Sequence, residues 1–389
     1  MRKALLYIFL HFFFVCQSSS DIVIRVGIWN QAANTQCIML LQGAHALAQA
    51  DSVILGWNDI QVYTIIADGD SLSVLEDGKL CIRASRLKVS LPPDSKFRIR
   101  LSEGSQERSF RGCMEFHARS GKMSMINETD LDTYIGGVVE AEAGPRLPPE
   151  FYKVQALITR TYVLGHLRRH ESEGFNVCDK EHCQVFRGIS SKSADIPEAV
   201  NATSNLVLGD SAGAFIQATF FSNCGGYTVN SEEVWEKRVS YLRAVKDTFC
   251  LRSRSARWKK ELSDDEYFSC MRRCCRDYEK HDDVLSKEGG VLMNNLRSAV
   301  LQAGKCYVPY KRIREELKLK SAFFTATNRN GKLLLEGRGF GHGVGLCQEG
   351  AIEMSRRGFK YDQILHYYYR NVNILHLSKM DVFAIPEDF

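Results

Sequence analysis

The chain has 389 residues, enough for two or three domains with ample hydrophobic cores. Its formal net charge of +5 is mild and its basic residues are spread along the chain apart from one cluster, which argues against a nucleic-acid binder. The same balance suits weak attraction to an anionic envelope surface or polymer.

The first twenty residues have the order of a secretory signal peptide. Arg2 and Lys3 precede a largely apolar run at 4–15, and a small polar stretch follows at 18–20. Because the apolar run is short for a bilayer span, we expect cleavage near Ser20 and an exported chain in the periplasm or cell envelope. An uncleaved signal that anchors the chain is the alternative, and no later segment reads as transmembrane.

Residues 21–120 predict a β-rich N-terminal region. Short β-branched and aromatic runs, for example IVIRVGIW at 22–29 and IQVYTIIA at 60–67, alternate with turn sequences such as DGD and EDG. Nothing in these runs looks catalytic. The region is therefore a scaffold or a docking module.

Residues 121–389 predict a second domain of the α/β (α+β) class. Thr129 and Asp132 resemble a capping box, and apolar residues at helical spacing follow them. A second helix is expected to begin after the proline pair at 148–149 and to end at Gly174.

The last part of the chain is mixed in character. Residues 250–320 read as a helical, polar, cysteine-bearing insertion, and two short helices beyond it are expected to end at Gly358 and Asn371. The chain holds thirteen cysteines, twelve of them after the signal. Because export permits disulfides, part of this set is expected to be bridged, in a pairing that the spacing alone does not provide.

Glu142 is the most informative single residue. Steps of three and four along the first helix run from Ile135 through Val138 to position 142, so this carboxylate falls at the edge of the apolar face. Desolvation there raises the pKa of a carboxyl group, as a general acid at neutral pH requires. Glu140 points elsewhere and is expected to be solvated. The alternative is a structural Glu142 satisfied by backbone groups or by an arginine such as Arg160.

The stretch CDKEHC predicts a zinc site. Cys178, His182 and Cys183 lie within six residues and are soft ligands of the kind that zinc prefers. A complete structural site needs a fourth ligand, and the candidates are a water molecule, His342, Cys224 or Cys347. The alternatives to a metal site are a disulfide between the two cysteines of this stretch or free thiols.

Two glycine-rich loops lie later in the chain. GRGFGHGVGLCQEGA, residues 337–351, places glycines at alternate positions around His342, a pattern that forfeits packing in a strand or a helix. It is either a tight structural crossing or the floor of a site that something approaches closely. FSNCGGYTVNSEEVW, residues 221–235, is either a groove wall or simply a loop. The first loop does not have the sequence of a phosphate cradle.

Six motifs in the same order resemble the stage II sporulation protein D (SpoIID) family. They are YIGGVVEAE, VQALITRTYVL, CDKEHCQVFRG, CGGYTVNSEEVW, YLRAVKD and GRGFGHGVGLCQEGA, within residues 109–373. The resemblance implies an α/β fold with a substrate groove and lytic transglycosylase activity on peptidoglycan glycan strands, while some members are described as amidase enhancers. The implied partners are those strands and an amidase that removes peptide stems, with no nucleic acid and no membrane beyond an uncleaved signal.

The resemblance also implies roles for individual residues. The family's catalytic glutamate follows a GVV run and a small residue, which places it on Glu142. This residue would protonate the glycosidic oxygen between N-acetylmuramic acid and N-acetylglucosamine, and then accept the proton of the muramic C6 hydroxyl to leave a 1,6-anhydro end. Zinc at Cys178, His182 and Cys183 is the one cofactor implied. Substrate contacts are expected from one helix and from the glycine-rich loops, at Gln155, Arg160, Asn223, Gly225, Gly226, Tyr227, Gly341, His342, Gly343 and Gln348.

Two features depart from the family pattern. Family members usually have Glu-Met-Pro where this chain has Glu-Ala-Gly-Pro from Glu142 onward, and the insertion at 250–306 is additional. A first rival function is a hydrolytic muramidase that uses water and a second carboxylate, such as Glu140 or Asp179. A second rival is a non-catalytic wall-binding protein that activates an amidase.

Overall fold

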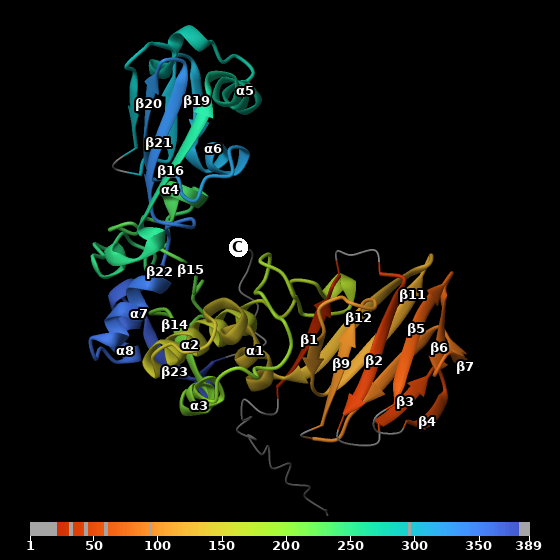
Figure 1. The fold of residues 1–389 in the computed structure, drawn as a ribbon. Helices are drawn as coiled ribbons and strands as arrows, with labels where there is room; N and C mark the ends of the chain where they lie inside the picture. Colours follow the sequence, from red (N-terminus) through yellow and green to blue (C-terminus); the bar gives the residue numbers. More distant parts are fainter. Residues whose placement is uncertain are drawn as a thin grey trace, which may run out of the picture.

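The computed structural model describes residues 22–30, 34–42, 46–57, 61–93, 95–294 and 297–380. The predicted signal peptide lies outside these residues. Figure 1 shows a β-rich part formed by the N-terminal strands, a central part with most of the helices, and an upper subdomain that contains the predicted insertion and continues beyond residue 320. The fold is of the α+β class, as the sequence predicts. Within the described residues, no helix combines the length and apolarity needed to cross a membrane.

Two β-sheets face each other in the N-terminal part. One sheet has the strand order β13-β1-β12-β11-β8-β3-β4 and the other has the order β10-β9-β2-β5-β6-β7. Buried and less buried residues alternate along strands such as β9, so each sheet turns one face to a shared core. The strands are β1 (Val23–Ile28), β2 (Gln36–Gln42), β3 (Ala46–Ala50), β4 (Val53–Trp57), β5 (Val62–Asp68), β6 (Ser71–Glu76), β7 (Lys79–Ala84), β8 (Arg86–Ser90), β9 (Lys96–Arg100), β10 (Arg108–Phe110), β11 (Cys113–Arg119), β12 (Lys122–Asp130) and β13 (Val177–Cys178).

One strand of the first sheet comes from later in the chain. β13 pairs in parallel with β1, with Val177 opposite Val26 and Cys178 opposite Gly27. A Cβ added at Gly27 would lie 2.7 Å from the ring of Phe175, so a larger residue would push this segment away. The β-rich region extends to Asp130, beyond the predicted boundary at residue 120, and its hydrophobic core is continuous with that of the central helices.

The central part is organised around two consecutive helices. Asp130, rather than Thr129, caps the first helix, because its carboxylate accepts a hydrogen bond from the N–H of Thr133 at 2.8 Å. The second helix begins at Pro149 as predicted but ends at Gly165, well before Gly174. The elements of this part are α1 (Leu131–Ala143), α2 (Pro149–Gly165), α3 (Asp195–Ala202), β14 (Leu206–Gly209), β15 (Phe220–Phe221), α4 (Glu232–Trp235), β22 (Leu346–Cys347), α7 (Gln348–Arg356), α8 (Tyr361–Tyr368) and β23 (Asn373–His376).

The two C-terminal helices end close to the predicted points. Gly358 follows α7 with a φ of 89° and Asn371 follows α8 with a φ of 53°. Both lie in the left-handed region that ends helices.

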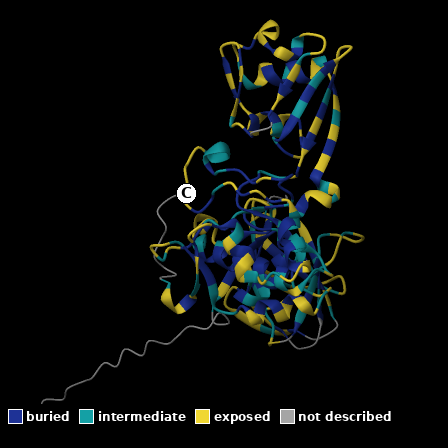
Figure 2. Cartoon of the chain, turned by 90° about the vertical axis from the view of Figure 1, so that its left-hand side faces the viewer, coloured by how far each residue is buried: buried dark blue, intermediate teal, exposed yellow. Residues whose placement is uncertain are grey.

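The insertion and the two strands that follow it, as far as Arg338, form one mixed α/β subdomain, so the prediction of a helical segment is wrong. This subdomain is called the insertion below. Its four-stranded sheet has the strand order β16-β21-β20-β17. Buried and less buried residues alternate along β20 and β21, so one face of this sheet covers a hydrophobic core that is separate from the main core. Figure 2 shows buried residues gathered inside this subdomain as well as inside the rest of the chain. Its elements are β16 (Arg257–Ser263), α5 (Asp264–Cys274), β17 (Val291–Met293), β18 (Val300–Ala303), β19 (Cys306–Pro309), α6 (Tyr310–Glu316), β20 (Phe324–Arg329) and β21 (Lys332–Arg338).

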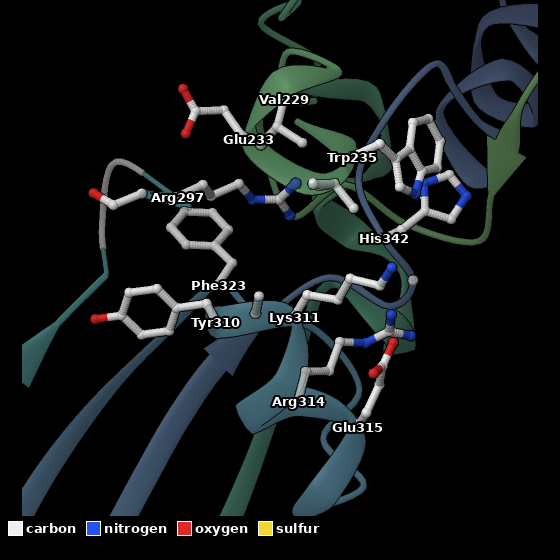
Figure 3. Close-up of a pocket in the computed structure, with 14 residues that line it drawn as sticks. Val229, Glu233, Trp235, Arg297, Tyr310, Lys311, Arg314, Glu315, Phe323 and His342 are labelled. Atoms are coloured by element: carbon white, nitrogen blue, oxygen red, sulfur yellow. The ribbon is translucent and has the colours of Figure 1, made fainter. Parts of the chain in front are cut away.

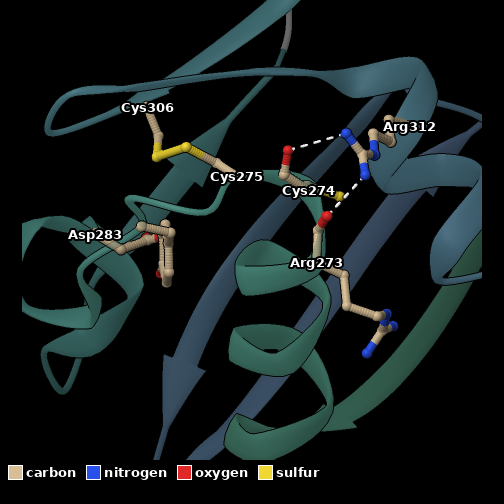
Figure 4. The surroundings of a disulfide bond; sticks show 7 residues. Arg273, Cys274, Cys275, Asp283, Cys306 and Arg312 are labelled. Carbon is tan, nitrogen blue, oxygen red and sulfur yellow. Dashed lines mark hydrogen bonds between the residues drawn. A yellow bond between two sulfur atoms is a disulfide. The ribbon is translucent and has the colours of Figure 1, made fainter.

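A disulfide between Cys275 and Cys306 joins the end of α5 to the start of β19 (Figure 4). Beside it, the guanidinium of Arg312 donates hydrogen bonds to the carbonyl oxygens of Arg273 at 2.7 Å and Cys274 at 3.1 Å. These bonds satisfy carbonyl groups at the end of α5 that have no partner within the helix.

We predict that replacing both disulfide cysteines, Cys275→Ala and Cys306→Ala, destabilises the insertion. The bond closes a loop with a sequence separation of 31 residues. Its loss should lower the free energy of unfolding by about 3 to 4 kcal/mol, because the unfolded chain gains conformational freedom. Chemical denaturation of the variant and the parent measures the difference. Cys81→Ala, at an exposed free thiol in β7, is the control and should leave stability unchanged; a loss below about 1 kcal/mol in the double variant would contradict the prediction.

Candidate functional site

Glu142 lies in the last turn of α1 with its two oxygens in different surroundings. The N–H of Val185 donates a hydrogen bond to Oε1 at 3.1 Å. Oε2 accepts no hydrogen bond from the described residues. Burial raises the pKa of the Glu142 carboxyl and the nearby charge of Glu181 adds to this, while the Val185 hydrogen bond and Arg187 act in the opposite direction. The predicted rise of this pKa is therefore confirmed.

The turn after Glu142 is held by a buried tyrosine. Gly144 ends α1 with a φ of 76°, a conformation that favours glycine. The hydroxyl of Tyr152 donates to the carbonyl oxygen of Gly144 at 2.9 Å and accepts from the N–H of Leu147 at 3.0 Å. The Ala-Gly-Pro sequence that replaces the family's usual Met-Pro thus forms a defined turn next to the carboxylate.

Glu140 is half-buried, and its carboxylate holds a loop at the surface in addition to facing solvent as predicted. A single oxygen of its carboxylate accepts hydrogen bonds from the hydroxyl of Ser190 at 3.0 Å and from the N–H groups of Ser191 at 2.9 Å and Lys192 at 2.7 Å. The physical reason is that the loop at 190–192 folds back over α1 and presents its donors to this side of the helix. Glu140 is an anchor for that loop.

The segment 178–188 packs against α1 and carries the Glu142 partner. The hydroxyl of Tyr134 donates to the side-chain oxygen of Gln184 at 3.3 Å, one residue before Val185. A Cβ at Gly137 would lie 2.6 Å from the ring of Phe186 and would overlap the carbonyl oxygen of Gly188. The absence of a side chain at this one helical position lets the segment approach.

The predicted soft ligands lie together, and a fourth one joins them. His170, Cys178, His182 and Cys183 each offer one ligand atom, and these atoms all lie within 4.8 Å of one another. Cys183 Sγ is 3.4 Å from His170 Nε2 and 3.6 Å from His182 Nδ1. Glu173 contacts the other ring nitrogen of His170 and so orients the ring. The donor set matches the Cys₂His₂ type of structural zinc site.

His170 was missed because the second helix was expected to continue to Gly174. Its place eight residues before Cys178 was the available signal. None of the predicted fourth protein ligands belongs to this group, since Cys224 and Cys347 belong to another group. Cys178 and Cys183 are both free thiols, so the alternative disulfide between them is not formed.

The glycine-rich loop at 337–351 packs closely against the glycine-rich loop at 221–235, so the first of its two interpretations, a tight structural crossing, describes it. A Cβ at Gly339 would lie 2.5 Å from the carbonyl oxygen of Asn223, and a Cβ at Gly341 would lie 2.7 Å from Phe221. A Cβ at Gly343 would overlap the guanidinium of Arg297. The missing side chains therefore make room for the protein itself, which accounts for the glycines without a ligand.

His342 has no free polar atom for a substrate, contrary to the prediction. Nε2 lies 3.0 Å from the carbonyl oxygen of Phe220, and Nδ1 accepts from the N–H of Val344 at 3.2 Å. Burial lowers the pKa of His342 to about 4, so the ring is neutral at physiological pH. The ring packs between Phe221 and Trp235, with centroid distances of 5.3 Å and 5.2 Å.

The remaining residues predicted to contact substrate differ in how exposed they are. Gln155 and Arg160 are 0% exposed. Arg160 donates to the carbonyl oxygen of Thr203 at 2.9 Å and to Asp132 at 3.2 Å, so it is a structural clamp and not a partner of Glu142. Asn223, Gly225, Gly226 and Gly343 are also buried, whereas Gly341 and Gln348 are half-buried and Tyr227 is 50% exposed.

A cavity of about 210 Å³ lies where the insertion meets the glycine-rich loop (Figure 3). Lys311 and Arg314 of α6 line one side, and Trp235 and His342 line the other. The cavity thus combines cationic groups with aromatic surface.

Together these observations describe an α+β protein with one protonatable glutamate beside a group of four soft ligands. Residues 119–209 match the family model SpoIID, described as stage II sporulation protein. The matched range contains Glu142 and the whole His170 group. The predicted resemblance to the SpoIID family is therefore confirmed.

Similarity to three other proteins extends beyond that range. The chain is 29% identical over 273 residues to stage II sporulation protein D of Bacillus subtilis, covering 66% of this chain and 77% of the relative. It is 26% identical over 277 residues to an uncharacterised protein of Brachyspira hyodysenteriae, covering 70% of this chain and 74% of the relative. It is also 26% identical over 282 residues to an amidase enhancer of Bacillus subtilis, covering 60% of this chain and 39% of that protein.

We predict that Gly137→Ala loosens segment 178–188 whereas Gly136→Ala does not. At Gly137 the new methyl group meets Phe186 and Gly188, but at Gly136 its nearest neighbour is Ser190 Cβ at 3.6 Å, an ordinary contact. Gly137→Ala should cost about 1 to 3 kcal/mol by overpacking, and Gly136→Ala should stabilise the helix by up to about 1 kcal/mol. Thermal denaturation and hydrogen exchange at 184–188 measure both; similar effects of the two changes would show that the segment does not depend on this contact.

Proposed function

We propose that this protein is a peptidoglycan lytic transglycosylase that cleaves the bond between N-acetylmuramic acid and N-acetylglucosamine, with Glu142 as its single general acid and base. The observation that carries the proposal is the state of Glu142. One oxygen accepts a hydrogen bond from the N–H of Val185, and the other accepts none from the described residues. Burial raises the pKa of the Glu142 carboxyl group. Such a carboxyl group keeps its proton to a higher pH than a solvated glutamate and can transfer it to a bound oxygen.

The reaction follows from one carboxyl group acting twice. Glu142 donates its proton to the glycosidic oxygen, the bond from that oxygen to the muramic anomeric carbon breaks, and N-acetylglucosamine leaves with a free hydroxyl. The C6 hydroxyl of the same muramic residue then attacks the anomeric carbon. The Glu142 carboxylate takes the proton of that hydroxyl and returns to its acid form. The product is a 1,6-anhydro end, and no water is consumed.

The acids considered for a hydrolytic alternative each hold a part of the fold in place. Asp179 is 0% exposed, pairs with Arg108 at 2.7 Å and accepts the N–H of Trp29 at 3.2 Å. Glu140 uses one oxygen to hold the loop at 190–192. This supports a mechanism whose nucleophile belongs to the substrate rather than a two-carboxylate hydrolysis.

Zinc on the His170 group is the second part of the proposal. Four protein ligands leave no open position, so the ion would supply structural fixation and not reaction chemistry. The chain's own residues connect that fixation to Glu142: Cys183 is followed by Gln184, which contacts Tyr134, and by Val185, which donates to Glu142. A fixed ligand loop therefore holds the hydrogen-bond donor of the proposed acid in place.

The proposed substrate lies outside the cytoplasm, so the function requires the export that the N-terminal sequence predicts. The similarity to an amidase enhancer supports an amidase as a partner, one that removes peptide stems from the glycan.

We predict that Glu142→Gln lowers glycan cleavage by about two to four orders of magnitude, the usual contribution of a general acid and base. Glycan binding should survive, because glutamine keeps the shape and can still accept the Val185 hydrogen bond. The measurement is mass spectrometry of purified glycan strands digested by the purified protein. In the parent, cleavage should fall as the pH rises through the raised pKa of Glu142, since the acid form is lost, and the variant's residual activity should lack this dependence.

Glu140→Gln is the matched control. Its amide oxygen can accept the same three hydrogen bonds, so cleavage should stay within a few-fold of the parent. Equal cleavage by both folded variants would make Glu142 a structural carboxylate. Products heavier by one water would indicate a hydrolytic muramidase, and an inactive parent that stimulates an amidase would favour the non-catalytic alternative.

We predict that His170→Gln and Cys183→Ser each remove one equivalent of zinc relative to the parent protein, because each takes a ligand from the same site. Metal analysis of protein purified without chelator measures this. His166→Gln is the control: His166 is a near neighbour in sequence whose Nδ1 lies 2.7 Å from the carbonyl oxygen of Tyr162, outside the ligand group. Unchanged zinc in both ligand variants would refute the site.

A further inference from the structure

A second group of potential metal ligands contains three cysteines and one aspartate. Cys224, Asp247, Cys250 and Cys347 each offer one ligand atom, these atoms all lie within 4.8 Å of one another, and all four residues are buried. The group is separate from the His170 group. The proposed reaction uses none of the four.

The spacing of these atoms suits a tetrahedral ion. Cys224 Sγ lies 3.4 Å from Cys250 Sγ and 3.3 Å from Asp247 Oδ2. Zinc–sulfur bonds of about 2.3 Å and zinc–oxygen bonds of about 2.1 Å place neighbouring ligand atoms roughly 3.5 to 3.8 Å apart at the corners of a tetrahedron. The two close pairs therefore need only small shifts.

We propose that Cys224, Asp247, Cys250 and Cys347 bind one structural zinc ion. Three thiolates select a soft cation, and four protein ligands close the site to water and substrate. The inference goes beyond the proposed glycan cleavage and does not rest on it.

The sulfur atoms already receive hydrogen bonds of the kind that stabilise thiolates. Cys347 caps the N-terminus of α7, and its Sγ accepts from the N–H of Gly350 at 3.4 Å and from the N–H of Cys224 at 3.3 Å. Cys224 Sγ accepts from the N–H of Gly226 at 3.3 Å. Backbone donors and a helix N-terminus both favour negative charge on sulfur.

The carboxylate is aimed at the sulfurs by its own partners. The hydroxyl of Tyr368 donates to Asp247 Oδ2 at 2.9 Å, and the N–H of Phe249 donates to Oδ1 at 2.9 Å. A Cβ at Gly350 would overlap both this carboxylate and the tyrosine hydroxyl, so the glycine leaves the space that they occupy. Such supporting bonds are a regular feature of metal sites.

A buried cation stands beside the group. Arg297 is 9% exposed and its Nη2 donates to the carbonyl oxygen of Cys224 at 2.5 Å. No carboxylate of the described chain lies within ion-pair distance of this guanidinium. Three thiolates and a carboxylate on a divalent ion leave a net negative charge, which a buried arginine partly offsets.

A disulfide explains the group less well than an ion. Three sulfur atoms meet here, so pairing two of them would leave the third thiol and the buried carboxylate unused. In the same structure Cys275 and Cys306 are bonded, whereas Cys224 and Cys250 are separate thiols. A single ion satisfies all four side chains.

The position of the group indicates what the ion does. Cys250 lies shortly before β16, where the chain enters the insertion, and Cys347 lies shortly after β21, where the chain returns. Figure 1 shows the insertion joined to the central part through this connection. An ion bound to both residues would fix the insertion on the core and so hold the two sides of the cavity in Figure 3 together.

The test is the zinc content of full-length variants purified without chelator. The parent should hold about two equivalents, one for each group of ligands. Cys250→Ser/Cys347→Ser and Cys178→Ser/Cys183→Ser should each hold about one, and the quadruple variant none. Cys37→Ala, at a buried free thiol in β2 outside both groups, should keep both equivalents.

A second measurement covers the case in which Cys250→Ser/Cys347→Ser does not fold. Cys178→Ser/Cys183→Ser loaded with Co²⁺ should show the near-ultraviolet thiolate charge-transfer bands and the visible bands of a tetrahedral site. Absence of metal from that variant would overturn the proposal, as would a mapped Cys224–Cys250 disulfide in the native parent. Neither readout involves glycan cleavage, so failure of the proposed enzymatic function is distinguished from failure of this site.

Discussion

The close packing of segment 178–188 on helix α1 is the contact on which the candidate site depends. Gly137 has no side chain, so Phe186 and Gly188 reach the helix, and Gln184 meets Tyr134. This approach brings the N–H of Val185 to Glu142. The same segment begins in β13, which pairs with β1, so the N-terminal sheet and helix α1 are parts of one packed unit.

Two glutamates that differ by two positions acquire different roles from this packing. Two residues along an α-helix correspond to a rotation of about 200°, so the carboxylates leave α1 in nearly opposite directions. Glu140 meets three donors at 190–192 and becomes an anchor. Glu142 meets one donor in a partly buried environment. Burial raises the pKa of its carboxyl group, and its second oxygen accepts no hydrogen bond from the residues that the structure describes. The chain thus gives the two carboxylates different surroundings through the number of donors that it offers to each.

Glycine contacts that exclude a side chain and groups of potential metal ligands both occur where segments distant in sequence meet. The glycine-rich loop passes Asn223 and Phe221 at distances that exclude a Cβ, and Cys224 and Cys347 lie at the ends of the same crossing. Three members of the His170 group belong to segment 178–188, which packs against α1. Because the insertion has a core of its own and joins the central part through this crossing, its orientation depends on how well these few residues are held.

The sequence by itself determined what depends on local periodicity and spacing. The strands before Asp130, the starts of the two central helices, the buried edge on which Glu142 lies and three of the four members of the His170 group follow from residues that are near one another in the chain. The motif order was sufficient for the resemblance to the SpoIID family.

Only the tertiary structure decided what depends on contacts between distant residues. His170 joined the zinc-type group because α2 ends at Gly165 and the chain turns back, which no helical pattern showed. Both ring nitrogens of His342 are occupied by backbone atoms that the crossing brings in. Cys224, Cys250 and Cys347 meet across more than a hundred residues, and the sheet of the insertion closes around a separate core. These features arise from packing, and packing is set by the whole chain rather than by the spacing within any one stretch of it.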